Sequence, residues 1–152
     1  LAGIDSIETD TKLAALVQIL QAKNNPKPSR SICVLTNYRS TQAYLQTALM
    51  EGGFEVRLLH GGLALDLRSS VIEDFREHGG LLLATTALVA QGTSMPYVDS
   101  LILFDLPRSS LEKQLILGRF WRFGRAAPLT IEVIRGVALE PSAGDSFGFG
   151  EF

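Results

Sequence analysis

The sequence predicts an α/β domain, built as a parallel sheet of about five to six strands with helices on both faces. Short apolar runs alternate along the chain with longer segments whose apolar positions recur at helical spacing. The runs are apolar almost throughout, which is typical of strands buried on both faces. With 152 residues, of which 46% are hydrophobic and 20% charged, the chain is long enough for one sizeable core.

The first half of the chain supplies two helices and the first strand. A helix is expected over residues 10–22, with Asp10 as its N-cap and an apolar stripe that stops before a Pro-containing segment. Residues 31–36 form a continuous apolar run of strand length. Ser40 is expected to cap a second helix, which the Gly-Gly pair at 52–53 terminates.

The alternation continues through the second half. A strand is expected over 54–59 and a helix over 66–77. The apolar face of that helix carries Leu67, Val71, Ile72 and Phe75. Further strands are expected at 80–85, 100–104 and 129–134. Ligands bind beyond the carboxyl ends of such strands, so function is expected in the loops at 36–40, 60–63, 85–95 and 105–110.

Composition narrows the class of protein. The net charge is −2, so any attraction to phosphate must come from a local cluster of basic residues. One such cluster lies between Asp105 and Arg125, a segment with five basic and two acidic residues. Cys33 is the only cysteine, which excludes an internal disulfide and favours a reducing, cytoplasmic setting with a buried, inert thiol. No zinc-ligand spacing occurs, and the longest apolar run is too short for a membrane helix. We therefore expect no metal site and no membrane partner.

The usual phosphate-binding loops are absent. The sequence contains no G-x-x-x-x-G-K-[ST] and no G-x-G-x-x-G after the first strand. The isolated chain is therefore expected to bind no Mg-ATP and to catalyse no reaction. Because it begins with Leu1, we expect a piece of a longer protein. Residues 1–136 are expected to form the domain, and 137–152 a tail or linker.

Four segments, taken in order, resemble the second RecA-like lobe of superfamily 2 helicases and translocases. They are SICVLTNYRSTQAYLQTALMEGGFEVRLLHGG, LRSSVIEDF, LLLATTALVAQGTSMPYVDSLILFDLP and GRFWRFGR. The third looks like motif V and the fourth like motif VI. The form of the fourth leans toward the Swi/Snf-type group rather than the DEAD-box group.

This resemblance implies that the chain supplies half of an ATPase site. In the family, an N-terminal lobe holds ATP and Mg²⁺, and motif VI of the second lobe supplies arginine fingers to the phosphates. Arg119 and Arg122 are three apart, so on one helix they project from the same face. Arg122 is the expected finger, Arg119 its partner and Arg125 a supporting residue. The alternative is a solvated basic face.

Motif V departs from the family pattern. Gly92 would let the backbone approach the nucleotide closely. Ser94 stands where relatives usually carry an acid or Asn at the ribose, and Gln91 stands where DEAD-box proteins have arginine. Leu115 stands where motif VI usually has Gln or His. These departures leave a second hypothesis open, a catalytically lapsed module that docks protein or nucleic acid.

The strand-end loops are the implied nucleic-acid contacts. The candidates are Thr36, Asn37, Arg39, Gly61, Gly62, Thr85 and Thr86. Arg68 is expected either to contact the strand or to pair with an acid such as Glu73, and His60 to pack at a strand end. Amides, hydroxyls and arginine suit a sequence-independent grip on the backbone. The expected partners are the N-terminal lobe of the same polypeptide and nucleic acid, with double-stranded DNA favoured.

Overall fold

A single parallel sheet lies at the centre of the fold. The computed structural model describes residues 2–23, 31–121 and 129–134. Its strands are β1 (Ser31–Thr36), β2 (Val56–Leu59), β3 (Gly80–Thr85), β4 (Ser100–Leu103) and β5 (Thr130–Val133). They pair in the order β2-β3-β1-β4-β5, and every pairing is parallel. The strands predicted from the apolar runs are therefore confirmed to within a few residues.

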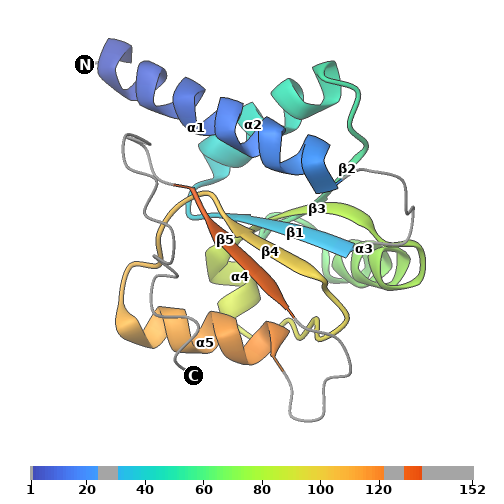
Figure 1. The fold of residues 1–152 in the computed structure, drawn as a ribbon. Helices are drawn as coiled ribbons and strands as arrows, with labels where there is room; N and C mark the ends of the chain where they lie inside the picture. Colours follow the sequence, from blue (N-terminus) through green and yellow to red (C-terminus); the bar gives the residue numbers. More distant parts are fainter. Residues whose placement is uncertain (1, 24–30, 122–128, 135–152) are drawn as a thin grey trace.

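Helices cover both faces of the sheet, as predicted. They are α1 (Ala2–Lys23), α2 (Arg39–Glu51), α3 (Leu65–His78), α4 (Thr86–Ala90) and α5 (Ser110–Phe120). Alternate residues of β1 point to opposite faces, with Val34 packing among α1 and α2, and Leu35 among the buried residues of α3, α4 and α5. Figure 1 shows α1 and α2 on one side of the sheet, with α4 and α5 on the other. The short helix α4 was not predicted.

Both predicted N-caps are wrong. Helix α1 begins at Ala2, so Asp10 lies within it, where its carboxylate accepts a hydrogen bond from the hydroxyl of Tyr44. Helix α2 begins at Arg39, one residue before Ser40, because the amide of Gln42 already bonds the carbonyl of Tyr38 at 3.0 Å. The predicted end of α2 is confirmed, since Gly52 caps it and the adjacent Gly53 has a φ of 90°.

The apolar face of α3 is rotated from the prediction. Phe75 is buried and Val71 and Ile72 are half-buried, but Leu67 is 53% exposed. At 100° per residue, Arg68 rather than Leu67 lies in line with Phe75 along the helix. The half-buried position is thus occupied by a guanidinium, which bonds backbone carbonyls of the preceding loop.

The helix of motif VI ends earlier than predicted. Helix α5 stops at Phe120, and Trp121 is extended with φ −102° and ψ 127°. The expectation that Arg119 and Arg122 share one helix face is not tested, because only Arg119 lies within the described residues. Arg122 and Arg125 lie outside the described residues, as does the predicted tail 137–152. Phe120 is fully buried against the sheet, whereas Trp121 is 54% exposed.

The predicted burial of Cys33 is confirmed. Its side chain is fully buried in β1, and burial raises the pKa of the thiol. None of the described helices is long and apolar enough to cross a membrane.

Candidate functional site

Asp105, which follows β4, joins the ends of two neighbouring strands to α1. One carboxylate oxygen accepts hydrogen bonds from the hydroxyl of Thr36 at 2.6 Å and the amide of Asn37 at 2.9 Å. The other pairs with the Lys12 ammonium at 3.0 Å. Burial alone would raise the pKa of Asp105, but these hydrogen bonds and the Lys12 charge outweigh it and hold the pKa below its usual value. This cluster was not predicted from the sequence.

The loop after β1 also bonds the loop after β4. The amide group of Asn37 donates to the carbonyl of Leu106 at 3.0 Å, and the Arg108 guanidinium donates to the carbonyl of Asn37 at 3.1 Å. The same guanidinium lies over the ring of Tyr38, 5.5 Å from its centroid. Asn37 is therefore held from both sides, and the residues beside it have defined positions.

Gln42 fixes the position of Arg39. This buried glutamine of α2 donates to the carbonyls of Leu59 at 3.1 Å and Leu83 at 2.9 Å, near the ends of β2 and β3. Its own oxygen accepts from the Arg39 guanidinium at 2.5 Å. Arg39 is exposed at the carboxyl edge of the sheet, where the sequence predicted a phosphate contact.

The loop after β2 is organised by Arg68. Its guanidinium donates to the carbonyls of Leu63 at 2.8 Å and Gly61 at 2.6 Å. The alternative pairing of Arg68 with Glu73 does not occur, because Glu73 pairs with Arg76. Gly61 and Gly62 are exposed, and the amide of Gly62 donates to the imidazole of His60 at 3.0 Å.

Arg39 and Arg68 are both tied to the end of β2, Arg39 through Gln42 to Leu59 and Arg68 to the carbonyl of Gly61. The imidazole of His60 is buried at the end of β2, as predicted, and burial lowers its pKa. The positive charges of Arg39 and Arg68 lower it further. Because Nδ1 accepts a hydrogen bond, His60 is neutral and adds no charge of its own. The structure thus brings together the two predicted basic residues and the two predicted glycines.

The three threonines predicted to contact nucleic acid lie at buried positions. Thr36 is fully buried, Thr85 is 6% exposed and Thr86 is 3% exposed. Thr36 and Thr85 stand side by side as register partners at the ends of adjacent strands. Little of their side-chain surface is therefore open to a ligand.

Motifs V and VI are joined by two hydrogen bonds. The amide of Met95 donates to the carbonyl of Arg119 at 2.7 Å, and the Arg119 guanidinium donates to the carbonyl of Ala90 at 3.2 Å. Gln91 and Gly92 follow directly and are exposed, and Ser94 is half-buried. Gly92 has a φ of 148°, a conformation that favours glycine. The predicted nucleotide-facing residues within the described part of the chain therefore lie together.

The residues of the strand-end loops and the residues of motifs V and VI occupy different parts of the domain. Helix α5 starts beyond the carboxyl end of β4 and must return toward the start of the parallel strand β5. Arg119, in its last turn, is thus at the opposite end of α5 from the strand-end loops. The five residues of α4 connect the two groups directly, from Thr86 to Ala90.

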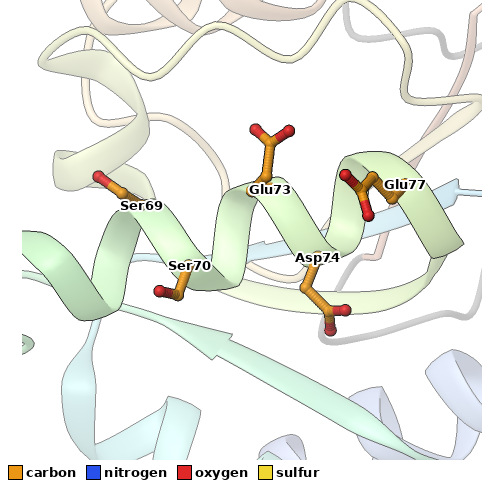
Figure 2. A pocket seen from close by; sticks show the side chains of 5 residues that line it. All are labelled: Ser69, Ser70, Glu73, Asp74 and Glu77. Carbon is orange, nitrogen blue, oxygen red and sulfur yellow. The ribbon is translucent and has the colours of Figure 1, made fainter.

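A shallow hollow on α3 is a separate feature. It is lined by Ser69, Ser70, Glu73, Asp74 and Glu77, whose side chains fan outward in Figure 2. None of the predicted site residues lines it, and Asp74 is already paired with Arg57 at 2.8 Å. Among the described residues, no group of three or more His, Cys, Asp or Glu side chains is arranged to hold a metal ion.

Comparisons with known proteins point to one family. Residues 11–124 match the family described as helicase conserved C-terminal domain. ATP-dependent RNA helicase DBP5 of Lodderomyces elongisporus is 33% identical over 101 residues, covering 62% of this chain and 20% of that protein. Pre-mRNA-splicing ATP-dependent RNA helicase PRP28 of Scheffersomyces stipitis is 30% identical over 110 residues, covering 72% and 23%. The chain thus spans about a fifth of the length of these relatives.

Solved structures give the same fold. S. cerevisiae Dbp5 bound to RNA and ADP BeF3 superposes with a TM-score of 0.69 and 27% identity, covering 84% of this chain and 33% of that one. The C-terminal part of the Fun30 ATPase domain superposes with a TM-score of 0.70 over 80% of this chain and 40% of that one, at 16% identity. The second likeness shows the fold alone. The predicted lean toward the Swi/Snf-type group therefore has no support from these sequence relatives, which are RNA helicases by name.

Proposed function

Because the chain belongs to the family of helicase conserved C-terminal domains, we propose that it is the second RecA-like lobe of a longer ATP-dependent RNA helicase. The observation that carries the nucleic-acid half of this proposal is that Arg39 and Arg68 are both tied to the end of β2 and the loop after it, Arg39 through Gln42 and Arg68 through the carbonyl of Gly61. Two guanidiniums beside exposed glycines suit phosphate groups of a backbone, read without regard to sequence.

RNA replaces double-stranded DNA as the proposed substrate. The sequence relatives are RNA helicases, and S. cerevisiae Dbp5 has been solved with RNA and ADP BeF3. The proposed contacts are Asn37, Arg39, Gly61, Gly62 and Arg68. Thr36, Thr85 and Thr86 are left out because their side chains are buried.

The nucleotide half of the proposal assigns ATP and Mg²⁺ to an N-terminal lobe of the same polypeptide. We assign Arg122 as the finger that stabilises charge on the phosphates, with Arg125 in support. Arg119 is better suited to positioning, because its guanidinium already bonds the carbonyl of Ala90. Its hydrogen bonds hold motif V against α5, which supports Gln91, Gly92 and Ser94 as the residues that line the nucleotide.

Helix α4 connects the proposed nucleic-acid contacts to the proposed nucleotide-lining residues. Closure of the lobes on ATP would act on Gln91 and Gly92, which follow α4 directly. The other end of α4 is Thr86, next to the last residue of β3 at the nucleic-acid edge. A shift of this short helix would therefore move both sites together.

Substituting Arg122 in the full-length protein tests the nucleotide half. Arg122→Ala is expected to lower RNA-stimulated ATP hydrolysis by about 10³–10⁵-fold while ATP binding is largely kept. Arg76→Ala is the matched control, because Arg76 is an exposed arginine of α3 that pairs with Glu73 on the same helix. Unchanged turnover in Arg122→Ala would remove the finger assignment. ATP hydrolysis by residues 1–152 alone would contradict the division of labour between lobes.

A lapsed module that docks protein or nucleic acid is the second candidate. Ser94 and Leu115 favour it, since each replaces the residue type expected at the nucleotide, and Leu115 is 39% exposed. Sequencing upstream of residue 1 separates the two candidates. A protein without G-x-x-x-x-G-K-[ST] there would favour the docking module.

A further inference from the structure

An exposed aromatic ring stands at the end of the central strand. Tyr38 follows β1 by two residues, and 53% of its surface is exposed. It is the N-cap of α2, yet its side chain makes no capping hydrogen bond. The ring therefore neither packs in the core nor caps the helix. Its neighbours in the chain, Asn37 and Arg39, are both proposed contacts to the nucleic-acid backbone.

Arg108 lies against this ring in a fixed position. Its Cζ is 5.5 Å from the ring centroid, and its Nη2 donates to the carbonyl of Asn37 at 3.1 Å. Its own amide donates to the carboxylate of Glu112 at 2.8 Å. Because Arg108 is anchored through both its backbone and its guanidinium, the pair is ordered before any ligand arrives, which reduces the entropy lost on binding.

The surroundings of the pair suit an anionic ligand with a flat face. Two acids lie nearby: Asp105, whose charge the ammonium of Lys12 compensates at 3.0 Å, and Glu112, whose carboxylate accepts the amide hydrogen bond of Arg108. Arg39 adds a second exposed guanidinium next to Tyr38 in the chain. A planar arginine stacks on aromatic groups and also binds phosphate through two parallel hydrogen bonds.

We propose that Tyr38 and Arg108 form a stacking platform for one unpaired base of a single-stranded nucleic acid. The base stacks on the exposed part of the tyrosine ring, and the phosphate beside it pairs with the Arg108 guanidinium. Bases within a duplex are already stacked on their neighbours, so the platform selects single strands. This inference rests on the proposed function, in which this edge of the sheet binds nucleic acid. It adds a contact to a base where the other proposed residues contact the phosphate backbone.

The test is binding of the full-length protein to a labelled oligouridine and to an abasic strand of the same length. The wild type is expected to prefer the strand with bases. Tyr38→Ala should weaken binding of that strand by about fivefold or more, the lower end of what one stacked base contributes. It should leave binding of the abasic strand unchanged. Tyr38→Phe keeps the ring and should bind both strands as the wild type does.

Two further variants separate stacking from general effects. Tyr44→Ala removes another exposed tyrosine of α2, which bonds Asp10 instead of lying at the strand ends, and should change neither affinity. Arg108→Ala should weaken both strands and reduce the salt dependence of binding, because it removes a phosphate contact. Circular dichroism melting of each variant shows that it is folded.

The outcomes distinguish the platform from the function on which it rests. If the wild type binds neither strand, the proposed nucleic-acid function fails and the platform falls with it. If the wild type binds both strands equally, or if Tyr38→Ala loses affinity for the abasic strand as well, the backbone grip stands and the platform is wrong. Equal losses on oligouridine and oligodeoxyuridine support stacking, because a stacked base is recognised by its face. A loss confined to RNA would mean contact with the sugar and overturn the proposal.

Discussion

The hydroxyl of Thr36 donates a 2.6 Å hydrogen bond to the carboxylate of Asp105, which lies 69 residues further along the chain. The same carboxylate holds the amide of Asn37 and the ammonium of Lys12, 93 residues before it. One acidic side chain thus joins α1, the end of β1 and the end of β4. The loops that we assign to the nucleic-acid edge are therefore positioned by hydrogen bonds within the domain.

Removing Asp105 should destabilise the domain. Asp105→Ala leaves the fully buried hydroxyl of Thr36 and the partly buried Lys12 without their acceptor. An unsatisfied buried polar group costs about 1–3 kcal/mol, so a fall of this size in the free energy of unfolding is expected. Chemical denaturation measures it. Glu51→Ala, at the exposed end of α2, is the control and should stay within about 0.5 kcal/mol of the wild type. Equal effects in both variants would show that the hydrogen bonds of Asp105 do not stabilise the domain.

The contribution of Asp105 should depend on pH in a defined direction. Its pKa is lowered in the folded protein, so the unfolded chain takes up a proton at higher pH than the folded one. The stabilisation is therefore fully present above the usual carboxylate range and is lost as the pH falls through the folded pKa. The difference in unfolding free energy between wild type and Asp105→Asn should shrink below about pH 4. A difference that grows on acidification would contradict the assigned direction.

Features that depend on a local sequence pattern could be predicted from the sequence. The strands were found because each is a run of apolar residues, and the end of α2 because it carries two glycines. Asp105 and Gln42 were missed because their importance lies in partners 17 to 93 residues away, which no local pattern records. The end of α5 at Phe120 was missed because neither Phe120 nor Trp121 is a residue type that usually ends a helix, although Trp121 is already extended. The hydrogen bond from Arg119 to the carbonyl of Ala90, 29 residues earlier, likewise has no local signal.

Gln42 offers a test of how far positioning affects binding. Gln42→Leu keeps the volume but removes two hydrogen bonds to the carbonyls of Leu59 and Leu83 and the acceptor for Arg39. We expect the free energy of unfolding to fall by about 1–3 kcal/mol. Affinity for RNA should fall as well, because Arg39 loses its fixed direction. Gln46→Leu, one turn later on α2 and half-buried, should change neither quantity. Lost stability with unchanged RNA affinity would remove Arg39 from the interface.

Gly92 and Gly118 have different backbone conformations, so replacing each with alanine should change the stability of the domain in opposite directions. Gly92, in motif V, has open space where an added Cβ would stand but a φ of 148°, so Gly92→Ala is strained whatever the room. Gly118 lies in α5, also has open space around the position of an added Cβ, and is helical, so alanine removes flexibility from the unfolded chain at no steric cost.

The expected shifts in unfolding free energy are a loss of about 1 kcal/mol or more for Gly92→Ala and a gain of about 0.4–1 kcal/mol for Gly118→Ala. Thermal melts of the two variants give the sign directly. In the full-length protein, Gly92→Ala should also weaken ATP binding, because the backbone of motif V changes where we place the nucleotide. If Gly92→Ala were as stable as the wild type and bound ATP normally, the positive φ would serve neither the fold nor the site.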